Sequence, residues 1–243
     1  MTLPVAILAG GLATRLRPIT EKIPKSLIEV AGEPFILRQL DYLRRQNIRE
    51  VVLCVGHLGE MIEAVVGDGS RFGLRVSYSL DGPALLGTGG ALRGAFRLLG
   101  ESSFVLYGDS YLPVDFGAIE AEFRDSNQPA LMTVLLNQNR WDKSNVLFLD
   151  GKILEYNKAA PRADFAYIDY GLTIVKRDVL ETYPANELFD LSVVYHRLSL
   201  EGRLHGYEVF DRFYEIGSPS GLKEADDFFR MGQKHDLRSA THR

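Results

Sequence analysis

The chain has 243 residues, of which 46% are hydrophobic and 25% are charged, and its formal net charge is -4 at pH 7. This composition is that of a globular protein and excludes disordered and fibrous classes. The acidic balance argues against a nucleic-acid partner, which needs a basic surface, and favours a small-molecule ligand. Cys54 is the only cysteine, so no internal disulfide and no zinc site of several thiolates can form.

The N-terminal residues lack a basic signal-peptide region, and no apolar run approaches the roughly 20 residues that span a bilayer. We therefore expect a cytoplasmic protein without membrane contact, present as a monomer or a homo-oligomer. Repeats and linker-like boundaries are missing from the sequence. We expect one domain over residues 1–231, followed by a frayed polar tail at residues 232–243.

Apolar runs alternate with helix-like spacings along the first half of the chain. The runs predict strands at residues 5–9, 51–55, 74–79 and 104–107, and the spacings predict helices at residues 35–48, 61–66 and 91–99. Strands separated by helices indicate βαβ units and therefore a mostly parallel sheet.

The second half is richer in strands. Strand patterns occur at residues 131–136, 146–149, 153–156, 167–175 and 206–210, and helical patterns occur at residues 191–200 and 222–229. Asp150 and Gly151 lie between two of these strands and predict a hairpin.

The most informative segment is residues 8–18, LAGGLATRLRP, directly after the first strand. Glycines at this place let backbone N–H groups approach a phosphate, and Thr14, Arg15 and Lys25 could add a hydroxyl and two cations. The spacing fits neither a P-loop nor the dinucleotide-binding fingerprint. For the two glycines alone, an ordinary turn beside a solvated basic stretch is the alternative.

Two later segments carry further chemistry. Gly87-Thr88-Gly89-Gly90 lies before a predicted helix, where it could bind a ligand or simply begin the helix. Asp109 follows the strand at residues 104–107, so its carboxylate lies at the carboxyl end of that strand. A hard oxygen ligand there suits Mg²⁺, and a turn or helix cap is the alternative.

These segments, in this order, resemble the signature of the sugar-1-phosphate nucleotidyltransferase family, G-G-x-G-T-R-L-x-P-x-T followed by P-K. The resemblance covers nearly the whole chain and favours the branch of heptose- and mannose-1-phosphate guanylyltransferases. It implies an α/β fold, namely a Rossmann-like three-layer sandwich with a mixed, mostly parallel central sheet. The sequence departs from the signature at Ala13, where glycine is usual, and we expect the methyl group to tighten the loop slightly.

The resemblance implies that the two glycine loops bind the nucleotide, through Leu8, Ala9, Gly10, Gly11, Thr14, Arg15, Gly87 and Thr88. Arg15 and Lys25 would be catalytic, Arg15 on the triphosphate and Lys25 on the charge that develops at the α-phosphate.

The implied cofactor is Mg²⁺. Asp109 matches the metal-binding aspartate of the family, and Glu215 stands where the family has a second aspartate. Glu215 has one more methylene than aspartate, so it could still bind the metal if its backbone lies farther from the ion. Asp211, four residues earlier, is the rival for this role.

The implied contacts to the sugar phosphate are Asn157, Lys158, Asp169 and Gly171. Lys158 matches the family's phosphate-binding lysine, whereas Asn157 replaces an acidic residue and Asp169 replaces an asparagine. An amide can still hydrogen-bond a hydroxyl, so these departures leave the sugar open.

The implied reaction joins an NTP and a sugar 1-phosphate into a nucleotide-diphosphate sugar and releases pyrophosphate, by Mg²⁺-dependent in-line attack on the α-phosphate. The base stays open, and we expect residues 81–86 to read it. A nucleotide-sugar-dependent glycosyltransferase is one alternative, although Asp109 does not begin a D-x-D motif. A non-catalytic nucleotide-sensing homologue is the other, and the departures from the family's motifs would fit it.

Overall fold

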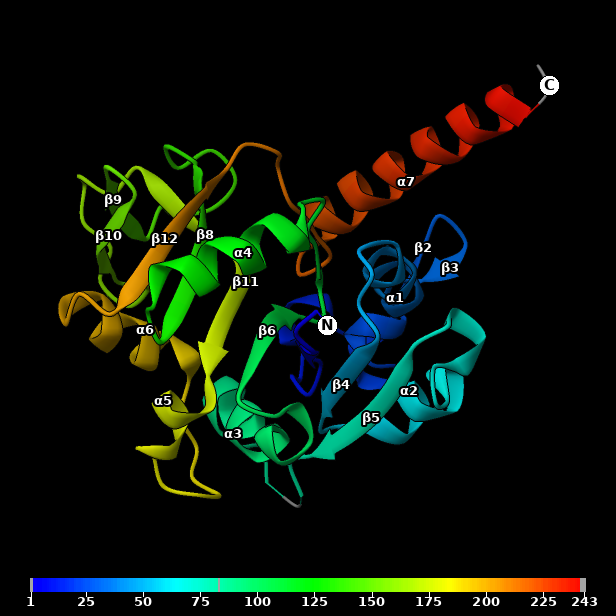
Figure 1. Cartoon of the computed structure of the whole chain (residues 1–243). Helices are drawn as coiled ribbons and strands as arrows, with labels where there is room; N and C mark the ends of the chain where they lie inside the picture. The colour runs from blue at the N-terminus through cyan, green and yellow to red at the C-terminus, as the bar shows by residue number, and fades with distance from the viewer. Residues whose placement is uncertain (1, 83, 241–243) are drawn as a thin grey trace.

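The centre of the fold is one mixed sheet with strands from almost the whole chain (Figure 1). The computed structural model describes residues 2–82 and 84–240, without the side chains of residues 233–240. In this range the nine strands of the sheet are β1 (Val5–Leu8), β4 (Glu50–Val55), β5 (Arg75–Leu80), β6 (Ser102–Tyr107), β8 (Ala130–Leu136), β9 (Val146–Leu149), β10 (Lys152–Tyr156), β11 (Tyr167–Lys176) and β12 (Leu204–Val209).

The strands lie in the order β5-β4-β1-β6-β11-β8-β12-β10-β9. β5, β4, β1 and β6 run parallel, and β11 is antiparallel to its neighbours β6 and β8. β12 is parallel to β8, whereas β10 is antiparallel to β12 and β9. The expected mixed, mostly parallel sheet is confirmed.

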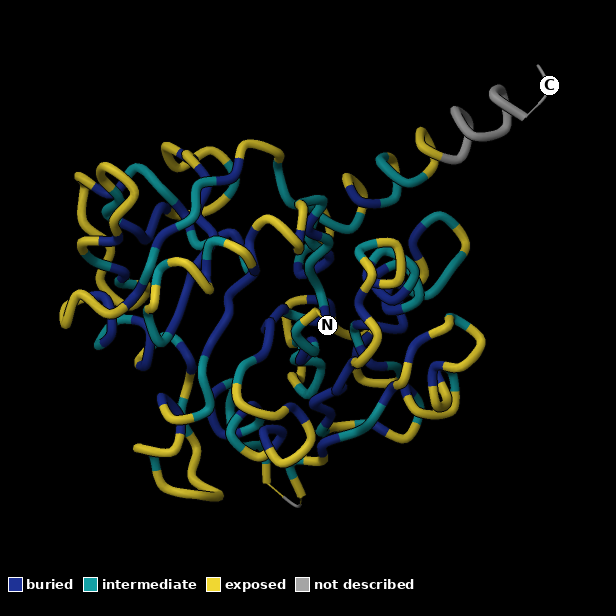
Figure 2. Tube along the Cα trace, viewed as in Figure 1, coloured by how far each residue is buried: buried dark blue, intermediate teal, exposed yellow. Residues whose placement is uncertain are grey.

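Helices cover both faces of this sheet. They are α1 (Phe35–Arg45), α2 (Gly59–Val66), α3 (Gly87–Leu99), α4 (Phe116–Ser126), α5 (Arg177–Glu181) and α6 (Leu191–Leu200). α7 (Pro219–Ala240) lies beside the sheet, and its Ala225 belongs to a third buried cluster with Leu16, Ile28 and Ile216. The first buried cluster joins α1, α2 and α4 to one face, and the second joins α3, α5 and α6 to the other. The strands between them are largely buried (Figure 2), so the three-layer sandwich is confirmed.

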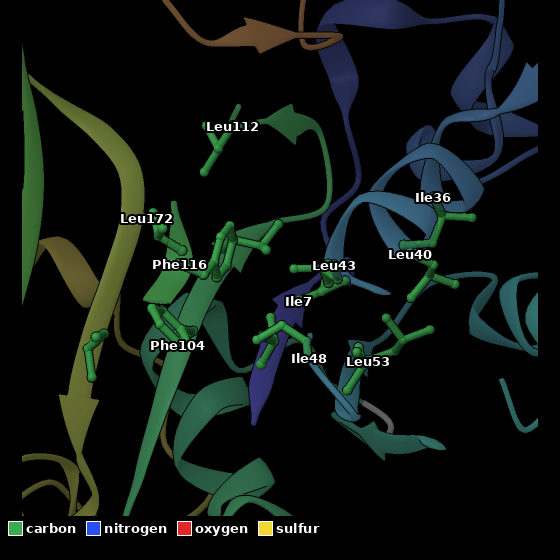
Figure 3. Packing of buried hydrophobic residues seen from close by; sticks show 14 of the residues in the cluster. Ile7, Ile36, Leu40, Leu43, Ile48, Leu53, Phe104, Leu112, Phe116 and Leu172 are labelled. Atoms are coloured by element: carbon green, nitrogen blue, oxygen red, sulfur yellow. The ribbon is translucent and has the colours of Figure 1, made fainter. Parts of the chain in front are cut away.

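Periodic apolar residues explain why α1 lies where it does. Ile36, Leu40 and Leu43 recur at helical spacing, are at most 1% exposed, and face Ile7 of β1 and Leu53 of β4 (Figure 3). Within the described part of the chain, none of the helices is apolar over enough length to cross a bilayer.

Two small two-stranded sheets lie outside the main sheet. β2 (Glu29–Val30) pairs with β3 (Glu33–Pro34), and β7 (Ser110–Tyr111) pairs with β13 (Tyr214–Glu215). Two-residue strands have no periodicity, so the sequence did not predict them. The β7–β13 pair matters for function because it brings residue 215 beside residue 110.

The predicted elements are present, with shifted ends. The hairpin at Asp150 and Gly151 is confirmed, and both residues have the positive φ of such turns, 49° and 77°. α7 continues to Ala240, so most of the segment expected as a frayed tail is helical, in line with its helix-forming Gln, Lys, Leu and Arg residues. The last turns of α7 project away from the sheet (Figure 1), and residues 241–243 lie outside the described range.

Candidate active site

A cavity of about 330 Å³ opens at the carboxyl ends of β1 and β6. Its lining includes eight of the residues singled out in the sequence: Leu8, Ala9, Gly10, Gly11, Lys25, Gly87, Thr88 and Asp109. Tyr107, next to the Asp109 motif, also lines it, as do Asp190 and Cys54, to which the sequence motifs did not point. Ligands of open α/β sheets bind at this edge, where the strand order reverses.

The first glycine loop is crowded against the neighbouring strand. The N–H of Ala9 donates to the carbonyl of Cys54 at 2.8 Å, and a Cβ on Gly10 would lie 3.1 Å from the backbone nitrogen of Gly56. A side chain at position 10 would therefore pack tightly against the backbone that follows β4. Thr14 and Arg15 lie outside the cavity lining, on an exposed 3₁₀ turn that spans Thr14–Leu16.

Ala13 has left-handed backbone angles, with φ at 48° and ψ at 46°. The hydroxyl of buried Thr20 donates to its carbonyl at 2.9 Å and holds the loop in this shape. The left-handed region is costly for a residue with a Cβ and easy for glycine. The expectation that the methyl group tightens the loop is therefore wrong, because it strains the loop instead.

We expect Ala13→Gly to raise the free energy of unfolding by about 0.5–1 kcal/mol, because relief of strain exceeds the added entropy of the unfolded chain. Urea unfolding followed by circular dichroism measures the change. A lower midpoint in the variant would contradict the strain argument.

Lys25 and Asp109 form an ion pair at the base of the cavity. The Lys25 ammonium donates to Oδ2 of Asp109 at 2.6 Å, and the two side chains are 18% and 25% exposed. The N–H of Gly108 donates to the carbonyl of Leu8 at 2.9 Å and ties the Asp109 turn to β1. The structure thus joins the first glycine loop, a cation and a carboxylate in one place.

Glu215 lies next to Asp109, because β13 pairs with β7. The N–H of Ile216 donates to the carbonyl of Asp109 at 2.9 Å. A Cβ on Gly217 would lie 3.1 Å from Nη2 of Arg15 and 3.4 Å from Oδ2 of Asp109. Arg15 and the two carboxylates therefore meet around Gly217, whereas Asp211 lines a separate cavity.

This pair of carboxylates fits a magnesium ion. Mg²⁺ is usually held by one or two carboxylates and completes its shell with water and substrate phosphates. The described residues contain no group of three metal-binding side chains, so water and substrate phosphates would supply the remaining ligands. Glu215 also accepts hydrogen bonds from the N–H of Gly217 and, at 2.9 Å, from the hydroxyl of Ser218. These contacts orient Glu215 at the start of α7.

The second glycine loop, at the start of α3, packs closely against the backbone of residues 187–189. Cβ atoms on Gly87 and Gly90 would lie 2.6 Å from the carbonyl oxygens of Phe189 and Glu187. The N–H of Gly89 donates to the carbonyl of Phe189 at 2.9 Å. This contact caps α3, which therefore begins four residues before the predicted start.

The same segment brings Asp190 to the cavity. Its Oδ1 accepts from the hydroxyl of Thr88 at 2.9 Å, and that hydroxyl accepts from the N–H of Leu191. Thr88 lines the cavity as expected, but the glycines beside it mainly admit residues 187–189. No sequence signal marked Asp190 beyond its place before a predicted helix.

Asp81 is a further carboxylate in the lining of the cavity, and it directly follows the last residue of β5. Burial raises the pKa of Asp81, and a hydrogen bond from the N–H of Leu86, at 3.3 Å, partly opposes this shift. Pro83, within the segment expected to read the base, lies outside the described residues. Nearby Cys54 is 1% exposed and its pKa rises to about 12 through burial, so its thiol stays protonated.

The predicted sugar-phosphate residues lie beside this cavity rather than in its lining. Asn157 donates to Oε1 of Glu155 at 3.2 Å and accepts from the N–H of Ala160 at 2.9 Å. Both ends of its amide are therefore engaged in shaping the turn, and Glu155 supplies a carboxylate next to it. Lys158 is exposed at the end of this turn.

Asp169 and Gly171 lie on β11, next to the end of β6. The N–H of Gly171 donates to Oδ1 of Asp169 at 2.9 Å, and a Cβ on Gly171 would lie 3.9 Å from the ring of Tyr107. Burial raises the pKa of Asp169 to about 6, against the hydrogen bond from Gly171 and the charge of Lys158. Asp169 is thus ionised at neutral pH and titrates just below it.

The raised pKa of Asp169 predicts how the free energy of unfolding changes with pH. The folded protein holds this proton more tightly than the unfolded chain, so the ionised carboxylate lowers stability near neutral pH and the loss disappears as the pH falls toward 4. We expect Asp169→Asn to raise the free energy of unfolding at neutral pH by about 2 kcal/mol, and to have little effect near pH 4. Urea unfolding at both pH values tests this, and an equal effect at both would contradict it.

An open α/β sheet with a cavity at the carboxyl ends of β1 and β6 is typical of nucleotide-binding proteins. The model of the Nucleotidyl transferase family matches residues 5–144, more than half of the chain. The chain therefore belongs to the sugar-1-phosphate nucleotidyltransferase family.

Similar proteins extend this match over most of the chain. D-glycero-alpha-D-manno-heptose 1-phosphate guanylyltransferase of Campylobacter jejuni is 25% identical over 88% of this chain and 94% of its own length. Glucose-1-phosphate thymidylyltransferase of Streptomyces griseus is 37% identical over 67% of this chain, which spans 46% of that protein. The solved structure of HddC from Yersinia pseudotuberculosis complexed with GMP-PN has a TM-score of 0.80 at 23% identity, covers 94% of this chain and 100% of its own, and shares its fold.

Proposed function

We propose that the protein transfers a guanylyl group from GTP to a sugar 1-phosphate and releases pyrophosphate. The observation that carries this proposal is a cavity lined by a glycine loop, Lys25 and Asp109, with Arg15 and Glu215 next to Asp109 around Gly217. Phosphoryl-type transfer depends on positioning and charge neutralisation, and these groups supply both.

Each residue has a separate task in this proposal. Backbone N–H groups of Gly10 and Gly11 face the phosphate chain, and Arg15 neutralises its outer charge. Lys25 moves from Asp109 to the α-phosphate, where it stabilises the charge that develops during attack. Asp109 and Glu215 would hold Mg²⁺, which when bound neutralises further phosphate charge. The sugar phosphate is already anionic, so no general base is needed.

Asp81 supports guanine as the base. A carboxylate only accepts hydrogen bonds, and guanine presents two adjacent donors, its ring N–H and its amino group. Uracil and thymine present one N–H between two carbonyl oxygens, which a carboxylate would repel. Relatives of more than one base specificity match the chain, so Asp81 carries this part of the proposal.

Pyrophosphate release tests the reaction. The protein is mixed with Mg²⁺, with GTP, UTP, dTTP or CTP, and with neutral hexose and heptose 1-phosphates. We expect release that needs both substrates and is fastest with GTP. Transfer from a nucleotide sugar without pyrophosphate would favour the glycosyltransferase, and GTP binding without turnover would favour the regulatory homologue.

The role of Asp81 has its own test. We expect Asp81→Asn to lower kcat/KM for GTP relative to UTP by roughly tenfold to 100-fold, because an amide presents a donor toward one guanine donor. Comparing the two nucleotides on one variant controls for any general loss of activity. An unchanged ratio would remove guanine selection from Asp81.

A further inference from the structure

Gln39 of α1 is a polar residue inside an apolar helix face. It is only 3% exposed, and it lies among the apolar core residues Ile36, Leu40 and Leu43 (Figure 3). Buried amides are rare unless their hydrogen bonds are used. The burial of the polar Gln39 side chain therefore needs an explanation, whereas the burial of its apolar neighbours does not.

The amide nitrogen of Gln39 holds both sides of the Asp109 turn. Its Nε2 donates to the carbonyl of Tyr107 at 2.9 Å and to the carbonyl of Ser110 at 2.7 Å. Both partners only accept hydrogen bonds, so the amide nitrogen and not its oxygen must face them. The two hydrogens of one amide thus bracket the backbone that carries Asp109.

The remaining contacts of this turn complete the restraint. The N–H of Gly108 donates to Leu8, and the carbonyl of Asp109 accepts from Ile216, each at 2.9 Å. β1, the residue after β13, and α1 thus fix the turn from three elements of the fold. The contact from α1 differs from the other two because it is made by a side chain that can be replaced without altering the backbone.

The amide oxygen of Gln39 is buried and has no hydrogen-bond partner among the described residues. An unpaired buried acceptor lowers stability. The amide is therefore better explained by the two bonds that it donates to the turn than by a gain in core stability.

We propose that Gln39 is a positioning residue for the metal site: it fixes the backbone of Asp109 and thereby orients the carboxylate to bind the divalent cation. The inference rests on the proposed function, since it assumes that Asp109 is a metal ligand. Residues that orient a ligand without touching the metal typically contribute tenfold to 100-fold in affinity or activity.

The test replaces Gln39 by Met, which keeps the length and loses both donors. Tyr42→Phe is the matched control, because Tyr42 lies one turn further along α1 and donates a comparable bond to the carbonyl of Val114 at 2.9 Å. We measure Mn²⁺ binding by electron paramagnetic resonance in the presence of a non-hydrolysable GTP analogue, the half-saturating Mg²⁺ concentration for pyrophosphate release, and the thermal midpoint.

We expect Gln39→Met to weaken Mn²⁺ binding and to raise the half-saturating Mg²⁺ concentration by about tenfold or more, while KM for GTP at saturating Mg²⁺ changes little. Tyr42→Phe should lower the thermal midpoint to a similar extent and leave metal binding unchanged. Equal metal affinity in both variants and wild type would overturn the role of Gln39. Wild type without any pyrophosphate release would instead overturn the proposed function.

If Gln39→Met does not fold, Gln39→Asn replaces it. Asn keeps the amide but is one methylene shorter, so it reaches at most one of the two carbonyls. We expect a smaller shift of metal affinity in the same direction, and wild-type affinity would contradict the inference.

Discussion

Asp109→Asn is expected to lower kcat/KM for pyrophosphate release by roughly 100-fold or more, equivalent to about 3 kcal/mol of transition-state stabilisation. The amide keeps the shape of the side chain but removes the charge that faces Lys25 at 2.6 Å and that would bind the metal. The half-saturating Mg²⁺ concentration should therefore rise. Steady-state kinetics across a Mg²⁺ titration measure both effects.

Asp211→Asn is the matched control for this experiment. Asp211 was the rival for the second metal ligand, and it lines the cavity that contains Tyr42 and Arg45, away from Asp109. The control should keep wild-type turnover and circular dichroism. A large loss in the control, or full activity in Asp109→Asn, would refute the assignment.

Lys25→Met should lower kcat by about 100-fold, because the cation that stabilises charge at the α-phosphate is lost. Its effect on metal dependence differs from that of Asp109→Asn, which raises the half-saturating Mg²⁺ concentration. Without the competing ammonium, Asp109 is free for the cation, so the half-saturating Mg²⁺ concentration should fall or stay constant. The same Mg²⁺ titration therefore separates the two residues.

Lys22→Met provides the comparison for Lys25. Lys22 is an exposed lysine three residues earlier on the same segment, so its removal changes the net charge equally. It should leave kcat unchanged. If both variants lose activity alike, the effect is one of overall charge and not of contact with the substrate.

Local pattern predicted much of the fold. Apolar runs placed β1, β4, β5 and β6 within two residues of their observed starts, because a strand buried on both faces needs continuous apolar residues. The two-stranded sheets β2–β3 and β7–β13 could not be predicted, since a two-residue strand has no period. The early start of α3 depends on Phe189, a partner about 100 residues away.

The site was predictable where a motif lies next to a strand end. Gly10, Lys25 and Asp109 line one cavity as the motifs implied. Asp190 and Gln39 were not found, because each acts through a contact distant in sequence and neither belongs to a recognisable motif. For Gln39 the one available signal is a polar residue within an apolar helix face.

The backbone angles of Ala13 could not be read from the sequence either. Its φ of 48° belongs to the tertiary shape of the loop, which is held by Thr20. A resemblance marks such a position only as a departure from glycine. The structure adds that the departure has an energetic cost.

The capping of α3 by Phe189 has a consequence for synthesis of the protein. The glycines of α3 leave the ribosome about 100 residues before their partner segment, a delay of roughly 5 to 20 s at usual rates of translation. During that time the first N–H groups of α3 lack the carbonyl of Phe189 as acceptor, and the part of the cavity lining that Asp190 provides has not been synthesised. A nascent chain that ends before residue 187 therefore carries the glycine motif without a complete nucleotide cavity.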